Sequence, residues 1–343
     1  MTGPRVSIII VNWNGREHLP VCLGSLQNQT FRDFETILVD NGSADGSREL
    51  VRERYPWVRL IVLPTNTGFS GGNNEGLRHA AGEYIVVLNN DTETDPGWLA
   101  EMVRVADANP RAGQVGCRIC AMDDHDRIDS LGHGVCADGM TRGRYRLRSW
   151  SEIKGEFAPV QEMFFGTACV SLYRRAALDE AGFYDDDMFA IGEDSDLGLR
   201  LRWYGWDALL ATGAVVYHKY SATSGVFSPF KLYLVERNHY WVAVKNFPLG
   251  MLLLVPWHTI VRYLVQVRIV LSGSGSGGEF AASGARGALV RALLKGTWDA
   301  LVGMPAMWRK RRLIMAESRR SPKEMSLLFR RYRMTFRELL DVK

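Results

Sequence analysis

The chain has 343 residues, of which 46% are hydrophobic and 23% are charged. This composition leaves room for about two globular domains and excludes a disordered, collagen-like or low-complexity chain. The formal net charge is only +4, but residues 306–343 carry 12 basic and 4 acidic side chains, which leaves the rest of the chain at −4. An acidic body with a basic tail favours an anionic surface as the partner of the tail and argues against a nucleic-acid-binding protein.

Two features predict a reducing, cytoplasmic compartment. The five cysteines are an odd number spread through a long chain, unlike the disulfide frameworks of secreted proteins. The start, Met1-Thr-Gly-Pro-Arg5, runs directly into an apolar segment, without the basic region and cleavage site of a secretory signal.

Apolar segments alternate with helix-like segments through the first hundred residues. Short strands rich in β-branched residues are predicted at 6–11, 34–40, 58–63 and 84–88, with helices between them. This is the pattern of an α/β fold, a mostly parallel sheet with helices on both faces. Ligands of such sheets bind beyond the carboxyl ends of the strands, which is where Asp40 and Asn89-Asn90-Asp91 stand.

The middle of the chain has a less regular pattern. Arginines at 142, 144, 146 and 148 alternate, which predicts a strand with all four on one face. A buried strand is predicted over 162–173, a helix over 195–204 and a strand over 208–217. We place the boundary of the first domain at residue 245.

Residues 246–343 are predicted to form a helical, membrane-associating region. The apolar segment 249–271 contains Pro256, Arg262 and Arg268, whereas a membrane-spanning helix needs about 20 mostly apolar residues. It is therefore predicted to lie on a membrane surface, followed by a Gly/Ser linker at 272–278 and a second apolar helix over 288–308. The alternative is that these helices pack on the rest of the chain or on a second subunit.

Three polar clusters have the composition of a ligand site, and each also has a purely structural interpretation. Asp40 and the turn 41–47 could bind a nucleobase or a ribose. Alternatively, these residues only form a turn and cap a helix. The glycines of 66–76 let the backbone approach a ligand, or simply make a tight connection. Asp91, the acidic run 193–196 and His218 could supply cation ligands and a general base, although acidic residues also favour helix N-termini.

In order and spacing, five segments resemble the family 2 inverting glycosyltransferases of the GT-A fold. The resemblance is closest to the rhamnosyltransferase-type members of bacterial polysaccharide assembly, and it covers roughly residues 5–240. The segments are VSIIIVNWNG (6–15), VDNGSADGS (39–47), NTGFSGGNN (66–74), LNNDT (88–92) and GEDSDL (192–197).

The resemblance implies donor-binding residues. Asp40 would bind the nucleobase, with the backbone of Val11 and Asn12 beside it. The ribose and diphosphate would be lined by Asn66, Gly71 and Asn74. Asn89 and Asn90 occupy the place of the first two positions of the Asp-x-Asp metal motif of the family, so they are also expected in the donor site.

The resemblance also implies a metal and a base. Asp91 would hold Mg²⁺ or Mn²⁺ against the diphosphate, and His218 falls where some relatives place a metal ligand. Asp194 would be the catalytic base, with Glu193 beside it in the catalytic pair. The negative charges of Glu193 and Asp196 would raise the pKa of Asp194.

The implied reaction is a single displacement that inverts the anomeric configuration, with the metal stabilising the leaving nucleoside diphosphate. We expect transfer of one sugar, with dTDP-rhamnose favoured as donor and a lipid-linked saccharide as acceptor, in the assembly of cell-wall or other cell-surface polysaccharide. UDP-hexose, N-acetylhexosamine and galactofuranose donors stay open, as does a homo-oligomer. Acceptor contacts are assigned to Arg144, Arg146, Thr167 and Asp196; the two arginines are chosen because arginine suits phosphate.

Rival functions fit the sequence less well. A nucleotidyltransferase would carry a Gly-rich loop with a downstream Arg and Lys where this chain has Asn12-Trp-Asn-Gly15. A non-catalytic sugar-nucleotide-binding protein would not need Asp91 and Asp194. Arg202-Trp203 follows the acidic pair too closely for a processive synthase. A zinc ribbon would need better spacing than that of Cys117, Cys120, His133 and Cys136.

Overall fold

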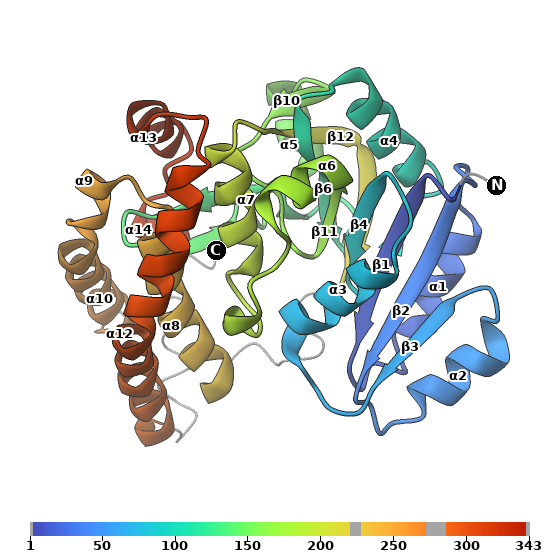
Figure 1. Ribbon diagram of the computed structural model, residues 1–343, viewed down its shortest axis with the longest axis horizontal. Coiled ribbons are helices and arrows are strands. Elements are labelled where there is room, and N and C mark those ends of the chain that lie inside the picture. Colours follow the sequence, from blue (N-terminus) through green and yellow to red (C-terminus); the bar gives the residue numbers. More distant parts are fainter. Residues whose placement is uncertain (1–2, 220–227, 272–285, 341–343) are drawn as a thin grey trace. The chain divides into compact units, whose positions relative to one another are not determined.

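The computed structural model describes residues 3–219, 228–271 and 286–340. They form two compact units (Figure 1). The first comprises the described parts of 1–133, 143–201 and 206–223, and the second those of 134–142, 202–205 and 224–343. The predicted domain boundary at residue 245 stays a prediction; the compact units group residues 229–246 with the helices that follow them.

A ten-stranded mixed sheet forms the centre of the first unit. Four neighbouring strands are parallel, as predicted: β4 (Tyr84–Leu88), β1 (Val6–Asn12), β2 (Phe34–Asn41) and β3 (Arg59–Leu63). Antiparallel β11 (Val170–Arg174) joins β4 to β6 (Ala112–Ala121), which runs parallel to β12 (Asp207–His218). Three short strands complete the sheet: β5 (Thr92–Thr94), β7 (Ile128–Ser130) and β10 (Val160–Glu162).

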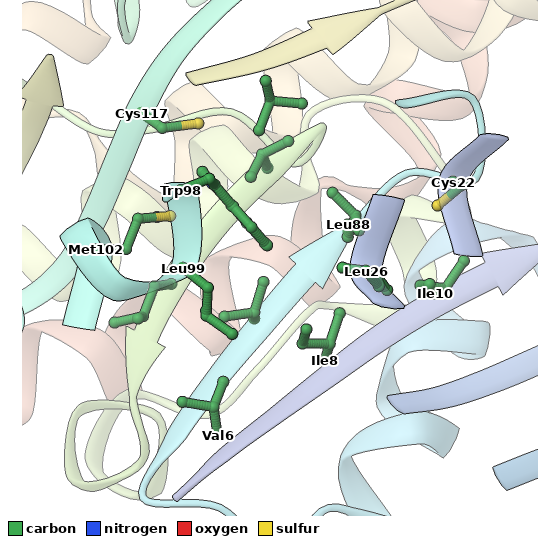
Figure 2. Packing of buried hydrophobic residues seen from close by; sticks show 14 of the residues in the cluster. Val6, Ile8, Ile10, Cys22, Leu26, Leu88, Trp98, Leu99, Met102 and Cys117 are labelled. Atoms are coloured by element: carbon green, nitrogen blue, oxygen red, sulfur yellow. The ribbon is translucent and has the colours of Figure 1, made fainter. Parts of the chain in front are cut away.

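Helices cover both faces of this sheet, because its central strands are apolar on both sides. Ile8 and Ile10 of β1 pack on one face with α1 (Leu19–Gln27), α2 (Ser47–Arg54) and α4 (Trp98–Ala108). Figure 2 shows the large side chains of α4, including Trp98, beside these strands. Ile9 faces the opposite way, toward α3 (Gly68–His79), α6 (Arg175–Ala181) and α7 (Glu193–Trp203).

The remaining elements of the middle segment are short. They are β8 (His133–Val135), β9 (Thr141–Gly143), α5 (Trp150–Ile153) and two 3-10 turns, η1 (Lys154–Glu156) and η2 (Asp186–Met188). β8 and β9 pair with each other in a separate two-stranded sheet.

Helices make up most of the second unit. They are α8 (Pro229–Asn246), α9 (Leu249–Leu252), α10 (Val255–Leu271), α12 (Arg286–Ala316), α13 (Pro322–Arg331) and α14 (Phe336–Leu340). α8 and α12 pack closely because of glycines in α12: a Cβ at Gly296 would lie 2.8 Å from the carbonyl oxygen of Tyr233. In the described part of the chain, every helix is too short or too polar to cross a bilayer.

Two predicted strands of the middle segment are wrong. Residues 144–147 form a turn, and Tyr145 and Leu147 have positive φ angles of 59° and 67°, so the alternation of arginines does not reflect a pleated strand. The predicted strand 162–173 is instead two strands, β10 and β11, around an irregular segment. Side chains hold the backbone of that segment: Gly166 N–H donates to Gln114 and Ala168 N–H donates to Asp194.

The C-terminal helices also differ from the prediction. The predicted helix 249–271 is interrupted after Leu252, which separates α9 from α10. The second helix extends well beyond the predicted 288–308 and includes Pro305, and the basic tail forms α13 and α14. The predicted Gly/Ser linker at 272–278 lies outside the described residues.

Candidate active site

Buried amides gather where β1 ends. Asn12 is fully buried; its Oδ1 accepts a 2.7 Å hydrogen bond from Asn90, and its Nδ2 donates to Ser43 Oγ at 3.3 Å. Gly15 lies against this pair, and a Cβ there would be 2.2 Å from Asn90 Nδ2. The structure therefore brings together two predicted donor-binding residues, Asn12 and Asn90. Val11, beside them, packs against Gly72 of α3.

Asp40 has structural partners at the end of β2. Its Oδ1 accepts from Arg48 Nε at 2.7 Å and from Ser43 N–H at 3.1 Å, and its side chain is fully buried. The carboxylate therefore stabilises the turn after β2 and the start of α2. Contact of Asp40 with a nucleobase stays a prediction.

The glycine-rich segment forms the start of α3. Asn66 Oδ1 accepts from Gly68 N–H at 2.8 Å and from Asn41 Nδ2 at 3.1 Å. Gly71 lies in the first turn, where a Cβ would meet Thr67 Oγ1 at 2.8 Å. Asn74 has structural partners: it accepts from Tyr184 N–H and donates to the Tyr184 carbonyl and to Asp186. Its amide therefore joins α3 to the segment after α6, and contact of Asn74 with a donor stays a prediction.

His218 lies between two carboxylates at the end of β12. Its Nδ1 is 2.8 Å from Asp129 Oδ2, and its Nε2 is 3.3 Å from Asp91 Oδ1. Arg146 forms a salt bridge with the other oxygen of Asp129. Burial lowers the pKa of His218, but Cys169, Asp129 and Asp91 outweigh it and raise this pKa well above its ordinary value. Two distant segments of the sequence thus meet here, and a metal-binding role for Asp91 and His218 stays a prediction.

The protein supplies only some of the ligands that a divalent cation would need at this position. Among the described residues, no three His, Cys, Asp or Glu side chains form a metal-binding group. Asp91 Oδ1 is nevertheless buried, and apart from the 3.3 Å approach of His218 Nε2 it has no hydrogen-bond partner among the described residues. A carboxylate oxygen and an imidazole nitrogen suit Mn²⁺, and a cation on two protein ligands can take its other ligands from phosphate and water. The residues present therefore fit a metal that is shared with a diphosphate.

Asp194 is fixed at the start of α7. Its Oδ2 accepts from Ala168 N–H at 3.0 Å, and its Oδ1 accepts from the N–H of Ser195 at 2.6 Å and from the Ser195 hydroxyl at 3.1 Å. His133 is close by, with Nδ1 3.6 Å from Asp194 Oδ2 and without a hydrogen-bond partner. The carboxylate is thus held in one orientation next to an imidazole with spare hydrogen-bonding capacity.

Glu193 has a different environment from Asp194. Its Oε2 is buried without a hydrogen-bond partner. Burial, and then the charge of Asp194, raise the pKa of Glu193 to about 8. Near neutral pH, Glu193 therefore keeps its proton.

The backbone just before this pair is strained. Phe189 and Ile191 have positive φ angles of 63° and 68°, an uncommon conformation for bulky residues. The Phe189 carbonyl accepts from Ser70 N–H at 3.0 Å, and Gly68 leaves no space for a Cβ, which would be 2.3 Å from that carbonyl oxygen. The segment thus connects the start of α3 directly to the start of α7.

Two of the four expected acceptor residues have charged partners inside the fold, and an acceptor contact of any of the four stays a prediction. Asp196 is fully buried and pairs with Arg200 at 2.9 Å, and Arg146 pairs with Asp129. Both charges are used inside the fold. Thr167 is buried next to Ala168, beside the Asp194 carboxylate, and Arg144 is partly exposed, with its guanidinium 5.4 Å from the ring of Tyr145.

Sequence reasoning missed Asp129 and His133 as site residues. Neither is in a recognisable motif, and both belong to short strands whose positions depend on pairing in three dimensions. The two glycines beside His133 were a local signal, because Gly132 has a φ of 82° and turns the chain toward Asp194.

Comparison with known proteins gives a consistent result. Residues 7–182, about half of the chain, match the family model described as glycosyl transferase family 2. An N-acetylglucosaminyl-diphospho-decaprenol L-rhamnosyltransferase of Mycobacterium tuberculosis is 29% identical over 239 residues, which are 64% of this chain and 77% of that protein. The O-antigen biosynthesis protein RfbC of Myxococcus xanthus is 31% identical over 235 residues, but the match spans only 18% of its length.

Two solved structures are similar in fold. GalNAc-T7 with UDP, GalNAc and Mn²⁺ has a TM-score of 0.58 at 15% identity, covering 72% of this chain and 49% of that one. The mannosyltransferase PcManGT from Pyrobaculum calidifontis, in complex with GDP-Man and Mn²⁺, has a TM-score of 0.53 at 18% identity, covering 92% and 87%. Both are GT-A glycosyltransferases, and the chain has this fold.

Proposed function

The chain belongs to glycosyl transferase family 2, and we propose that it transfers one sugar from a nucleoside diphosphate sugar to a lipid-linked saccharide, with inversion at the anomeric carbon. dTDP-rhamnose is the favoured donor, and the name of the mycobacterial relative supports both the rhamnose and the lipid-diphosphate acceptor. UDP- and GDP-linked sugars are the alternative donors, since the two structural neighbours bind these nucleotides.

One observation carries the proposal: the contrast between Asp194 and Glu193. Asp194 is held by three hydrogen bonds, whereas Glu193 beside it is buried and has a raised pKa. An oriented carboxylate of this kind can act as a general base. In the proposed step the acceptor hydroxyl gives its proton to Asp194 while its oxygen bonds to the anomeric carbon. The bond from that carbon to the diphosphate oxygen breaks, and the nucleoside diphosphate leaves.

The chain's other residues would bind and orient the donor. Asn12 and Asp40 would lie next to the base, and Asn66 and Gly71 next to the ribose and diphosphate. Asp91 and His218 would hold Mg²⁺ or Mn²⁺, which as a Lewis acid stabilises negative charge on a diphosphate.

The test is Asp194→Asn, measured as release of nucleoside diphosphate from dTDP-rhamnose with a lipid-diphosphate N-acetylglucosamine acceptor. Loss of the general base should lower kcat by about 10²- to 10⁴-fold. Binding of dTDP, followed by the shift in melting temperature, should be unchanged, because Asp194 is not expected to contact the nucleotide. The matched control is Asp179→Asn, the same chemical change at an exposed position of α6.

Other outcomes would reject parts of the proposal. Activity of Asp194→Asn near that of the wild type would remove Asp194 as the base. Turnover with a UDP- or GDP-sugar alone would change the donor and keep the mechanism. Nucleotide binding without turnover of any of these donors would favour a sugar-nucleotide-binding protein.

A further inference from the structure

Helix α10 has one of its two arginines, Arg262, on the inside and large apolar residues on the outside. Arg262 is 1% exposed and bonds to Asp138 at 2.5 Å and to Glu236 at 3.2 Å, all within the second unit. Four apolar side chains on the opposite side of the helix, spaced three or four residues apart, are each more than half exposed: Trp257, Ile260, Leu264 and Val267. A helix of a soluble protein normally has the reverse arrangement.

In helix α12, the inner and outer faces differ in the size of their side chains. Its face toward α8 carries small residues at helical spacing: Ala292, Gly296, Ala300 and Gly303. Its outer face carries large apolar side chains, all more than half exposed: Val290, Leu294, Trp298, Leu301 and Val302. Small residues inside and large apolar residues outside are typical of helices that contact lipid.

Charge around these faces is almost entirely positive. By sequence, α10 contains no acidic residue, and α12 contains one acidic residue against seven basic ones. That acid, Asp299, is bonded to Lys295 and to Tyr233. Exposed cations lie on both helices, at Arg268, Arg291, Lys295, Arg309 and Arg312.

These observations together identify an occupant. We propose that the outer faces of α10 and α12 dock onto an anionic lipid bilayer, with the helices lying in the interface. Apolar side chains enter the acyl boundary, tryptophans suit the interface, and basic side chains meet the lipid phosphates. A second copy of the chain fits less well, because it would bring two sets of like charges together. The helices do not need to span the bilayer for this contact.

The proposal is independent of the transfer reaction. It agrees with the expectation of a peripheral protein on the cytoplasmic leaflet, the membrane surface at which a lipid-linked acceptor would be found. Because membrane binding needs neither donor nor acceptor, its test and the test of Asp194 can fail separately.

The test is cosedimentation of the full chain with vesicles, without detergent. Vesicles of equal parts phosphatidylglycerol and phosphatidylcholine should bind the chain, pure phosphatidylcholine should bind it more weakly, and high salt should reduce the difference. The double variant Leu264→Glu, Leu294→Glu puts a charge into each outer face and should lose about tenfold or more of the affinity. Both positions are exposed, so the melting temperature should stay that of the wild type.

The matched control is Trp57→Glu, an exposed aromatic residue of the first unit that should bind vesicles normally. Equal binding of the wild type and the double variant would overturn the proposal. So would wild-type binding that does not depend on anionic lipid. A dimer in light scattering that dissociates in the double variant, without vesicle binding by the wild type, would assign these faces to a second copy instead.

Discussion

Replacing Asp129 tests whether His218 must be held in one orientation for the site to bind a divalent cation. Asp129→Asn keeps the size of the side chain and removes its charge. The variant weakens two interactions at the same time: the 2.8 Å contact of Asp129 with His218 Nδ1 and its salt bridge with Arg146. His218 then loses the contact that fixes its ring toward Asp91.

The size of the effect follows from the role of that contact. Partners that orient a metal-binding histidine change metal affinity by about 10- to 100-fold when they are mutated. Each factor of ten is about 1.4 kcal/mol, so the expected loss is roughly 1.4 to 2.8 kcal/mol of Mn²⁺ binding free energy. The salt bridge of Asp129 with Arg146 is only partly exposed, which favours the upper half of this range.

The measurement is direct titration of Mn²⁺ by electron paramagnetic resonance, in the presence of dTDP and without turnover. The matched control is Asp123→Asn, which breaks an exposed 2.6 Å pair with Arg127 and should not change the affinity. An Mn²⁺ dissociation constant for Asp129→Asn within about threefold of the wild type, with the fold intact, would show that Asp129 does not act on His218 in this way.

Three further predictions concern stability. Arg262→Met should lower the free energy of unfolding by about 3 to 5 kcal/mol in urea titrations, because Asp138 and Glu236 would be left as buried, uncompensated charges; a loss below about 1 kcal/mol would contradict the buried network. Burial raises the pKa of Glu193 from 4.5 to about 8. The contribution of protonated Glu193 to the stability of the fold is therefore complete below pH 4.5 and is lost as the pH rises through about 8. Glu193→Gln should remove this part of the pH dependence of the melting temperature, and an unchanged profile would refute the assignment. Gly15→Ala should cost about 1 to 3 kcal/mol and weaken dTDP binding in thermal-shift assays, since the new Cβ collides with the amide pair beneath it; wild-type melting and binding would show that the turn relaxes.

The central strands were predictable because burial on both faces leaves a continuous apolar run in the sequence. Ile8, Ile9 and Ile10 all lie inside, on alternate sides of one strand. The arginines at 142–148 show the limit of such patterns. Their alternation looks like a strand, but positive φ angles at Tyr145 and Leu147 break the backbone repeat. A residue pattern gives the direction of side chains only if the backbone is regular.

The site was predictable where a motif ends a strand. Asp91 follows β4 and His218 ends β12, and the fold brings them to 3.3 Å. Asp129 and His133 were not predictable in this way, since each acts only through a partner far away in sequence. The pairing of Asp196 was not predictable either. In the sequence it lies beside the expected base, whereas in the structure it forms a salt bridge with Arg200 of the same helix. A cluster of charges in sequence does not say which charge is used inside the fold.

The inward position of Arg262 has a consequence for anyone who wishes to shorten the chain. Removing α10 and everything after it would be the obvious way to obtain a protein that aggregates less, because these helices expose so many apolar side chains. The shortened protein would lack Arg262, the cation that pairs with Asp138 and Glu236, both of which are fully buried. Each of these two carboxylates would then be without its partner, which is strongly destabilising for a buried charge. Replacing outward-facing apolar residues one by one is the safer route to a soluble form.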